Sequence, residues 1–224
     1  MSLSPLPPMR RRDLVVFDLS RGMPRALAVL KAELGIGRLL RVLRGLALHS
    51  RRDPLRGLSR PWPRDKEWLT RRQLRPVVLL DDVLRDDLRM ERAARVALLG
   101  RVVGEAGARF LAANVPAGIE RAWRRASPAE RERFATSLVG RFFNVAAAPP
   151  RVDAASLAFD VQRCRFAELT AELGRPYLGP LFCAADSVYF ERPDVPVSLE
   201  RSGTLAEGAG CCDFRLRYRE GESD

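Results

Sequence analysis

The spacing of the apolar residues changes at Pro149-Pro150. Before these prolines, apolar residues recur every three or four positions, as on one face of a helix; after them, short stretches alternate apolar and polar residues, as in strands. Proline neither continues a helix nor donates to a sheet, so the change marks a boundary. The sequence therefore predicts an α+β protein with a mobile tail at residues 1–23, a helical region at 24–148 and a small α+β domain at 149–224.

The helical region begins with a basic amphipathic segment at residues 24–49. Its leucines and valines lie at helical spacing, and Gly35 and Gly37 predict a break, so the segment is one helix or a helix pair. Such a segment can lie on an anionic membrane surface, although packing against the protein's own core is commoner. A weak membrane-surface contact through residues 24–48 is therefore kept as an alternative. The prolines at 50–64 predict an irregular loop.

Three further helices are expected in this region. Residues 68–90 and 91–114 carry Ala, Val and Leu at helical spacing. Ser127-Pro128-Ala129-Glu130 is typical of a helix start, because Ser127 can cap the first turn and Glu130 stands where a capping-box carboxylate belongs. We expect this helix to end near Phe143.

The C-terminal part alternates strands with short helices. Residues 157–161, 197–201 and 214–218 alternate like strands, and residues 166–173 and 178–189 are expected to be helical. The resulting β-α-α-β-β order favours a small antiparallel sheet with helices on one face.

Composition narrows the choice of partner only slightly. The net charge is +11, and Lys31 and Lys66 are the only lysines, so arginine dominates. Guanidinium groups bind carboxylates and phosphates in bidentate fashion, which favours an anionic partner, but a biased nucleotide composition also enriches arginine. No zinc-finger or RNA-binding motif occurs, so the sequence predicts no specific nucleic-acid partner.

The distribution of apolar residues and cysteines favours a cytoplasmic protein. No run of about 18 uncharged apolar residues predicts a transmembrane helix, and Asp13 and Asp18 interrupt the segment where a signal peptide would have its apolar core. The four cysteines all lie in the last third and lack the regular spacing of a secreted disulfide framework. We therefore expect reduced thiols.

Several motifs of the last third occur in a characteristic order. Cys164 follows the first strand, Leu173-Gly174-Arg175-Pro176 follows the first helix, Cys183-Ala184-Ala185-Asp186 lies in the second, and Gly208 precedes a closing Cys212-Asp213-Phe214-Arg215. In these motifs the segment from about Leu157 to Tyr218 resembles the L-2-amino-thiazoline-4-carboxylic acid hydrolase family. The resemblance implies that water opens a 2-aminothiazoline ring to give a carbamoylated cysteine.

Such a substrate sets the charges that a site must supply. The reacting carbon lies between nitrogen and sulfur in an amidine-like group, so a carboxylate is needed for the cationic amidine and a cation for the substrate carboxylate. Asp186 or Asp213 is the candidate carboxylate, and Arg163, Arg165 or Arg215 the candidate cation.

A nucleophile is also needed, and the candidates are the thiols. A thiolate from Cys164, Cys183 or Cys212 attacks, or these cysteines hold a divalent metal that activates water. His49 is the only histidine and lies far upstream, which disfavours a Cys-His dyad. Adjacent residues of a strand point in opposite directions, so Cys211 is the first to be discarded. The alternative is that these cysteines are small buried apolar residues.

An aspartate-rich segment at residues 81–87 resembles the magnesium-binding motifs of isoprenoid enzymes. A second such motif is missing. The favoured interpretation is a solvated helix face on which the aspartates pair with Arg85, Arg89 and Arg92.

The leading hypothesis is a hydrolase-like enzyme acting on a small amidine-bearing or thiazoline-type carboxylate. The alternatives are a non-catalytic small-molecule binding or sensing module of the 4-vinyl reductase type, and a membrane-associated accessory protein of a biosynthetic pathway. An enzyme should bring Cys164, Cys183, Asp186, Cys212 and Asp213 to a pocket with an arginine. A binding module should have a more apolar pocket, and an accessory protein an exposed apolar stripe at residues 24–48.

Overall fold

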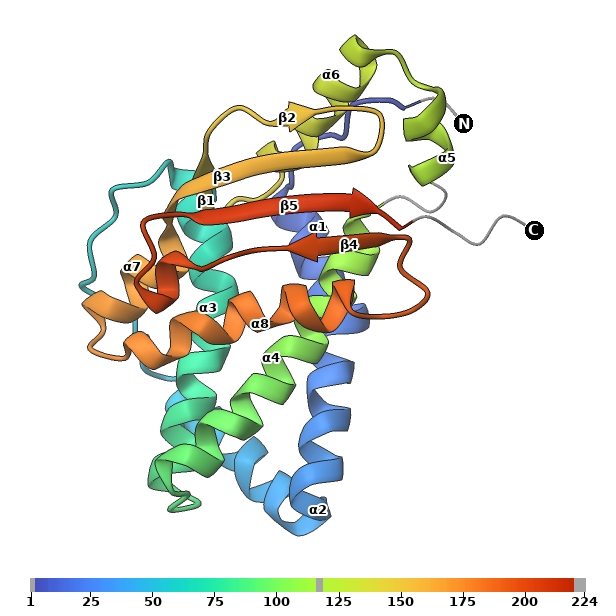
Figure 1. Ribbon diagram of the computed structural model, residues 1–224. Coiled ribbons are helices and arrows are strands. Elements are labelled where there is room, and N and C mark those ends of the chain that lie inside the picture. Colours follow the sequence, from blue (N-terminus) through green and yellow to red (C-terminus); the bar gives the residue numbers. More distant parts are fainter. Residues whose placement is uncertain (1–2, 116–118, 220–224) are drawn as a thin grey trace.

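A computed structural model describes residues 3–115 and 119–219. Long helices form one part of the molecule and an antiparallel sheet lies across their ends (Figure 1). This arrangement confirms the predicted α+β class, with a helical N-terminal region and a small sheet in the C-terminal part. None of the helices in the described ranges is both long enough and apolar enough to cross a bilayer.

Helical structure begins well before the predicted start. Helix α1 (Arg11–Phe17) continues through a π-helical turn, η1 (Asp18–Gly22), into α2 (Met23–His49). Leu3 and Leu14 are buried. The expectation of a mobile tail at residues 1–23 is therefore wrong for residues 11–22, because a buried leucine fixes this segment on the core.

The next helices follow the predicted pattern closely. Helix α2 is kinked at Gly35, whose φ of 72° and ψ of 169° are not helical, as the expected break requires. Helices α3 (Arg64–Asp86) and α4 (Arg92–Asn114) come next.

Two shorter helices complete the helical region, α5 (Ile119–Arg125) and α6 (Pro128–Gly140). The predicted capping box is present at the start of α6, where the backbone N–H of Ser127 donates to Glu130 Oε2 at 2.8 Å.

The sheet is built on one long central strand, β3 (Ser156–Cys164). The strands run in the order β1–β3–β5–β4, all antiparallel, with β5 at Cys212–Tyr218 and β4 at Val197–Glu200. The short strands β1 (Val145–Ala147) and β2 (Arg151–Val152) also pair with β3 and were not predicted. The expected boundary at residues 148/149 therefore separates β1 from its own sheet.

Helices α7 (Arg165–Glu172) and α8 (Gly179–Phe190) fill the connection from β3 to β4, with the short 3₁₀ turn η2 (Pro176–Leu178) between them. A second 3₁₀ turn, η3 (Leu205–Glu207), precedes β5. Helix α8 runs beside the sheet and crosses α4 (Figure 1). The crossing is close, because a Cβ atom on Gly107 would lie 2.4 Å from Cβ of Ala185.

The core does not divide at the middle of the chain. One buried cluster joins Leu14, Leu30 and Leu99 of the helical region to Phe166 and Leu181 of the C-terminal part. Apolar residues from both halves are therefore withdrawn from water together, and each half completes the other's core.

One face of the sheet is apolar and the other is charged. Leu157, Phe159 and Val161 of β3 alternate with less buried neighbours and join the core that α5 and α6 cover. Asp160 and Arg215 form a 2.8 Å ion pair on the opposite face. This alternation decides which side chains reach the interior.

Candidate functional site

A cavity of about 580 Å³ lies between the apolar face of the sheet and the helices. This volume is in the range of small-molecule binding sites. Four of the five predicted catalytic residues line it, namely Cys164, Cys183, Asp186 and Cys212. The structure thus brings together side chains that lie far apart in the sequence.

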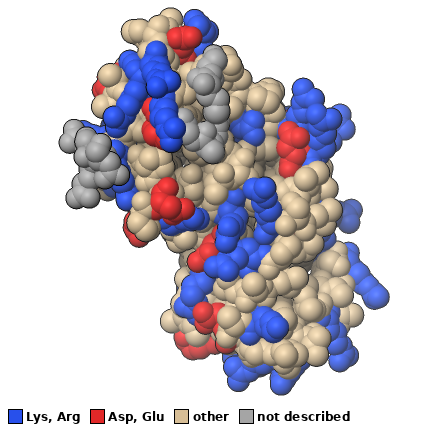
Figure 2. Space-filling view, turned by 90° about the vertical axis from the view of Figure 1, so that its right-hand side faces the viewer, with Lys and Arg blue, Asp and Glu red and all other residues tan. Residues whose placement is uncertain are grey.

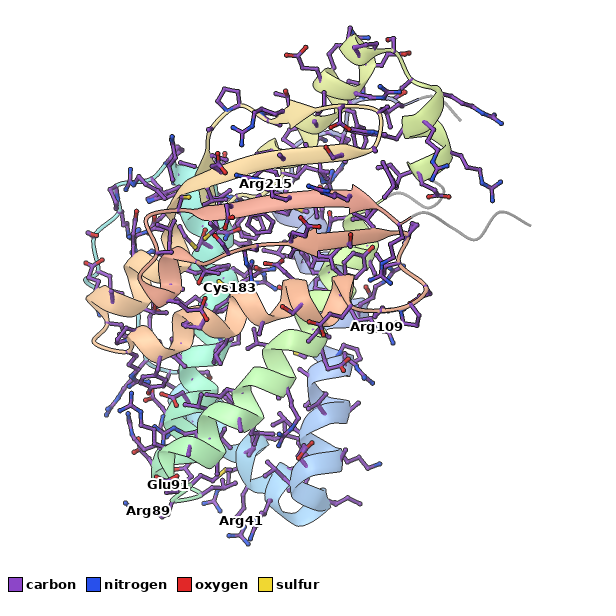
Figure 3. The ribbon with its side chains drawn as sticks, in the orientation of Figure 1. Arg41, Arg89, Glu91, Arg109, Cys183 and Arg215 are labelled. Carbon is purple, nitrogen blue, oxygen red and sulfur yellow. The ribbon has the colours of Figure 1, made fainter. Side chains whose placement is uncertain are left out.

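Three elements position these four side chains. Cys164 ends β3 and is the N-cap of α7. Cys212 begins β5 and pairs with Val161 of β3, so it also points to the apolar face. Cys183 and Asp186 lie three residues apart on α8, a spacing that puts both on one helix face. Figure 3 shows Cys183 on α8 beside the sheet.

Arg201 is the cation beside Asp186 in this cavity, and it is not among the residues predicted from the sequence. Its Nη1 lies 2.7 Å from Asp186 Oδ2, its Nη2 donates to the carbonyl oxygen of Cys183 at 3.2 Å, and its guanidinium lies 5.2 Å from the ring centroid of Phe214. The sequence predicted Arg201 as the last residue of a strand at residues 197–201, but nothing in the local sequence indicates a partner on α8.

The carboxyl group of Asp186 titrates near neutral pH. Burial raises its pKa to about 6, although Arg201 acts in the opposite direction. A carboxyl group with such a pKa can exchange a proton at physiological pH, as general acids and bases do.

The three thiols of the cavity are in their neutral form at pH 7. Burial raises the pKa of Cys183 to about 12 and also raises the pKa values of Cys164 and Cys212. The backbone N–H groups of Phe166 and Ala167 act in the opposite direction on Cys164 but do not outweigh burial. None of these thiols is therefore an activated nucleophile in this cavity.

The expectation that Asp213 and Arg215 share a pocket with the thiols is wrong. Both follow Cys212 on β5 at odd spacing, so they lie on the charged face of the sheet. Asp213 accepts hydrogen bonds from the backbone N–H and the hydroxyl of Ser202, both at 2.9 Å. Arg215 pairs with Asp160 outside the cavity (Figure 3).

The two other predicted arginines also lie outside the cavity. Arg165 is buried and makes a bidentate pair with Glu67 of α3, with both N···O distances at 2.9 Å. Arg163 pairs with Glu168 at 2.9 Å and lies 5.1 Å from the ring centroid of Trp62. Neither side chain is thus placed at the cavity, because ion pairs to α3 and α7 hold them elsewhere.

The aspartate-rich segment is only partly solvated. Asp81 is fully buried and is contacted by Arg95 at 2.5 Å, by Arg175 at 3.1 Å and by the hydroxyl of Tyr177 at 2.7 Å. The interpretation as a solvated face is wrong for this residue, whereas Arg85 pairs with its neighbouring aspartates as expected. Asp81 instead ties α3 to α4 and η2.

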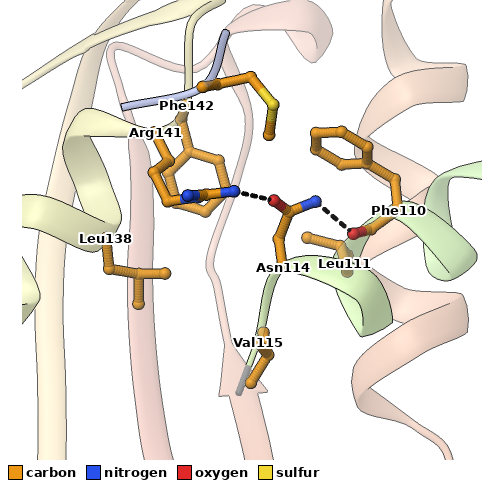
Figure 4. Close-up of a pocket in the computed structure, with 8 residues that line it drawn as sticks. Phe110, Leu111, Asn114, Val115, Leu138, Arg141 and Phe142 are labelled. Carbon is orange, nitrogen blue, oxygen red and sulfur yellow. Dashed lines mark hydrogen bonds between the residues drawn. The ribbon is translucent and has the colours of Figure 1, made fainter. Parts of the chain in front are cut away.

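Two further features of the described residues bear on ligand binding. Within residues 3–115 and 119–219, no three His, Cys, Asp or Glu side chains lie close enough to hold a metal ion together. A second cavity, near Asn114 and Arg141, has about 20 Å³ and holds at most a water molecule (Figure 4).

Comparison with models of protein families matches residues 86–216, more than half of the chain, to the family described as L-2-amino-thiazoline-4-carboxylic acid hydrolase. Searches among curated proteins and among solved structures found no match. The matched segment extends well before the motifs near Leu157 and includes α4. It contains Cys164, Cys183, Asp186, Arg201 and Cys212.

Proposed function

The chain belongs to the L-2-amino-thiazoline-4-carboxylic acid hydrolase family, and on that premise we propose that it opens the ring of a small cyclic amidine that carries a carboxylate. The observation that carries the proposal is the Asp186–Arg201 pair in the cavity wall.

Charge complementarity supports this class of substrate. A 2-aminothiazoline carboxylate carries a cationic amidine at one end and a carboxylate at the other. Asp186 offers a carboxylate to the amidine, and Arg201 offers a guanidinium, which binds carboxylates in bidentate fashion. On binding, the amidine of the substrate replaces Arg201 as the partner of Asp186, and its carboxylate replaces Asp186 as the partner of Arg201.

The proposed reaction is addition of water to the amidine carbon. Asp186 accepts a proton from water as the oxygen bonds to that carbon, and one ring bond of the carbon, to sulfur or to nitrogen, then breaks. The departing atom takes this proton from Asp186, and the hydroxyl group on the carbon releases its own proton to solvent as the carbonyl forms. The product is a carbamoylated cysteine; the released proton equals the extra proton of the cationic amidine, and the enzyme returns to its initial state.

The state of the thiols favours water over a cysteine as the nucleophile. Cys183 is the thiol nearest in sequence to Asp186, and its raised pKa of about 12 keeps it protonated at pH 7. A protonated thiol is a poor nucleophile, whereas a carboxylate with a pKa near 6 can activate water. The thiols then shape the cavity wall.

Substitution of the two charged residues tests the proposal. Asp186→Asn should lower kcat for 2-amino-thiazoline-4-carboxylate about 10²- to 10⁴-fold, the usual contribution of a general base. Arg201→Gln should mainly raise KM, whereas Cys183→Ser should retain activity. Ring opening is followed by mass spectrometry as the gain of one water.

The matched control is Arg215→Gln, which removes an arginine from the opposite face of the same sheet. It should leave both kinetic constants unchanged. An Asp186→Asn enzyme with full activity would exclude Asp186 as the general base. A Cys183→Ser enzyme without activity would indicate that the thiol of Cys183 is the nucleophile.

A non-catalytic binding module is the second candidate. The largely apolar lining of the cavity favours it, because apolar cavities of this size bind small molecules without further chemistry. Such a module would bind the thiazoline carboxylate with unchanged mass, and Asp186→Asn would then alter affinity alone.

A further inference from the structure

The cavity extends far beyond the groups that the proposed reaction needs. Asp186 and Arg201 lie between α8 and the sheet, whereas the cavity continues along α4 and is also lined by Ala26, Leu27 and Leu43 of α2. A single small ring held at the charged pair fills only a fraction of about 580 Å³.

The part of the cavity near α2 and α4 is apolar. Leu27, Leu43, Val103 and Phe110 form its walls. Two arginines of α3 also line the cavity, and both are paired: Arg72 with Asp18 of η1 at 2.8 Å, and Arg75 with Asp53 at 3.7 Å. A space with largely apolar walls favours the apolar part of a ligand.

The apolar part opens to the surface. Leu19, Met23 and Leu43 line the cavity and are also 60%, 50% and 40% exposed, so they form its mouth, with η1 and the start of α2 on one side and the part of α2 after the kink on the other. A chain that enters here can extend past α4 toward Asp186. The mouth and the charged pair thus belong to different walls of one continuous cavity.

We infer that this cavity binds a single-chain amphiphile, whose carboxylate head lies at Arg201 and whose alkyl chain runs along α4 to α2. The inference rests on the proposed function for the identity of the head group, and it extends that function by giving the ring substrate an alkyl chain. Burial of the chain supplies affinity that a small polar head cannot supply alone, because each buried methylene adds to the apolar area removed from water.

A series of saturated carboxylates from hexanoate to tetradecanoate tests the inference. Calorimetric titration of the full chain should give an affinity that rises about fourfold per methylene, equivalent to about 0.8 kcal/mol, until the cavity is filled. Arg201→Gln should weaken every member of the series by the same factor. An affinity that does not change with chain length would overturn the inference.

Matched variants on α2 locate the chain. Ala26 is half-buried and lines the cavity, whereas Ala28 is exposed and does not. Ala26→Phe should weaken tetradecanoate at least tenfold and leave hexanoate unchanged, and Ala28→Phe should leave both unchanged. Equal affinities in two folded variants would contradict the placement.

A second matched pair avoids any loss of folding caused by Ala26→Phe. Leu43 and Leu40 are both exposed leucines of α2, but only Leu43 lines the cavity. Leu43→Trp should slow the entry of long chains and weaken their binding, whereas Leu40→Trp should have no effect. Thermal unfolding of each variant verifies that it is folded.

The ring-opening assay separates this inference from the proposed function. Turnover of unsubstituted 2-amino-thiazoline-4-carboxylate without any chain-length effect on binding would overturn the chain site and leave the reaction standing. A clear chain-length effect without turnover of any thiazoline would support the chain site and overturn the reaction.

Discussion

Asp186 is a carboxyl group whose charge state changes within the physiological pH range. Burial raises its pKa to about 6. The proposed reaction needs the deprotonated form, so activity is present above this pH and is lost as the pH falls through it. We expect kcat/KM, which reports the free enzyme, to fall tenfold per pH unit below about 6.

The pH dependence of kcat/KM can be measured with 2-amino-thiazoline-4-carboxylate between about pH 4.5 and about pH 8 at constant ionic strength. Asp186→Glu is a useful companion, because it keeps the carboxyl group and should keep an acid limb. A profile that instead rises toward the pKa of a thiol would point to Cys183.

The alternation of side chains between the two faces of a strand explains which site residues could be predicted correctly. Once β5 is recognised as a strand, Cys212 faces the interior and Asp213 and Arg215 must face outward. The sequence contains this information, and the two outward residues were assigned wrongly because their types suited the chemistry. Arg201 is different, because its pairing with Asp186 depends on how β4 and α8 meet.

At the scale of elements, the Asp81 cluster holds α3, α4 and η2 together. Asp81→Asn leaves the buried Arg95 without its counter-charge and removes one of the two carboxylates that pair with Arg175, so we expect it to lower the free energy of unfolding by about 3–5 kcal/mol. Asp86→Asn on the same helix is the matched control, because its side chain is 46% exposed and its ion pair contributes about 0–1 kcal/mol.

Urea denaturation monitored by circular dichroism distinguishes the two variants. Equal midpoints for Asp81→Asn and Asp86→Asn would mean that the buried cluster does not stabilise the fold.

The kink of α2 depends on Gly35. Its φ of 72° and ψ of 169° lie in a region that only glycine adopts readily, so Gly35→Ala should cost about 1–3 kcal/mol although the added methyl group meets no atom. Gly37→Ala also meets no atom and lies in helical backbone, where alanine is favoured by up to about 1 kcal/mol.

The melting temperatures of these two variants should therefore move in opposite directions. A Gly35→Ala protein as stable as the parent would indicate that α2 can straighten without loss.

Helices were predicted well and short strands were not, for a physical reason. Helix α4 repeats its apolar residues over many turns, and the capping box of α6 is a local motif, so both are visible in the sequence. Strands β1 and β2 have three and two residues and form only by pairing with β3. Helix α1 was missed because its helical pattern is short and charged, and it depends on the burial of Leu14.

At the scale of the whole molecule, the net charge of +11 is visible as basic side chains on the protein surface (Figure 2). Basic side chains are spread over the face that Figure 2 shows. On α2, Ile36 and Leu40 are 63% and 61% exposed; the exposed Arg38 lies between them, and the exposed Arg41 and Arg44 follow. We propose that this part of α2 contacts anionic membrane surfaces.

Co-sedimentation with vesicles tests this contact. Phosphatidylglycerol vesicles should bind the protein at low salt and release it at high salt, and Ile36→Asp with Leu40→Asp should weaken binding at both. Phosphatidylcholine vesicles are the control and should not bind. Equal binding to both vesicle types would mean that attraction between basic residues and anionic lipid does not contribute to the contact.

The cavity wall joins two stretches of sequence of different character. The family match begins at residue 86 and contains Asp186 and Arg201, whereas Ala26 and Leu43 precede it. Exchange of the first third of the chain would therefore alter the length of ligand that fits and leave the reacting groups in place. In evolution, substitutions in this first third could change the range of substrates while the residues proposed to react stay the same.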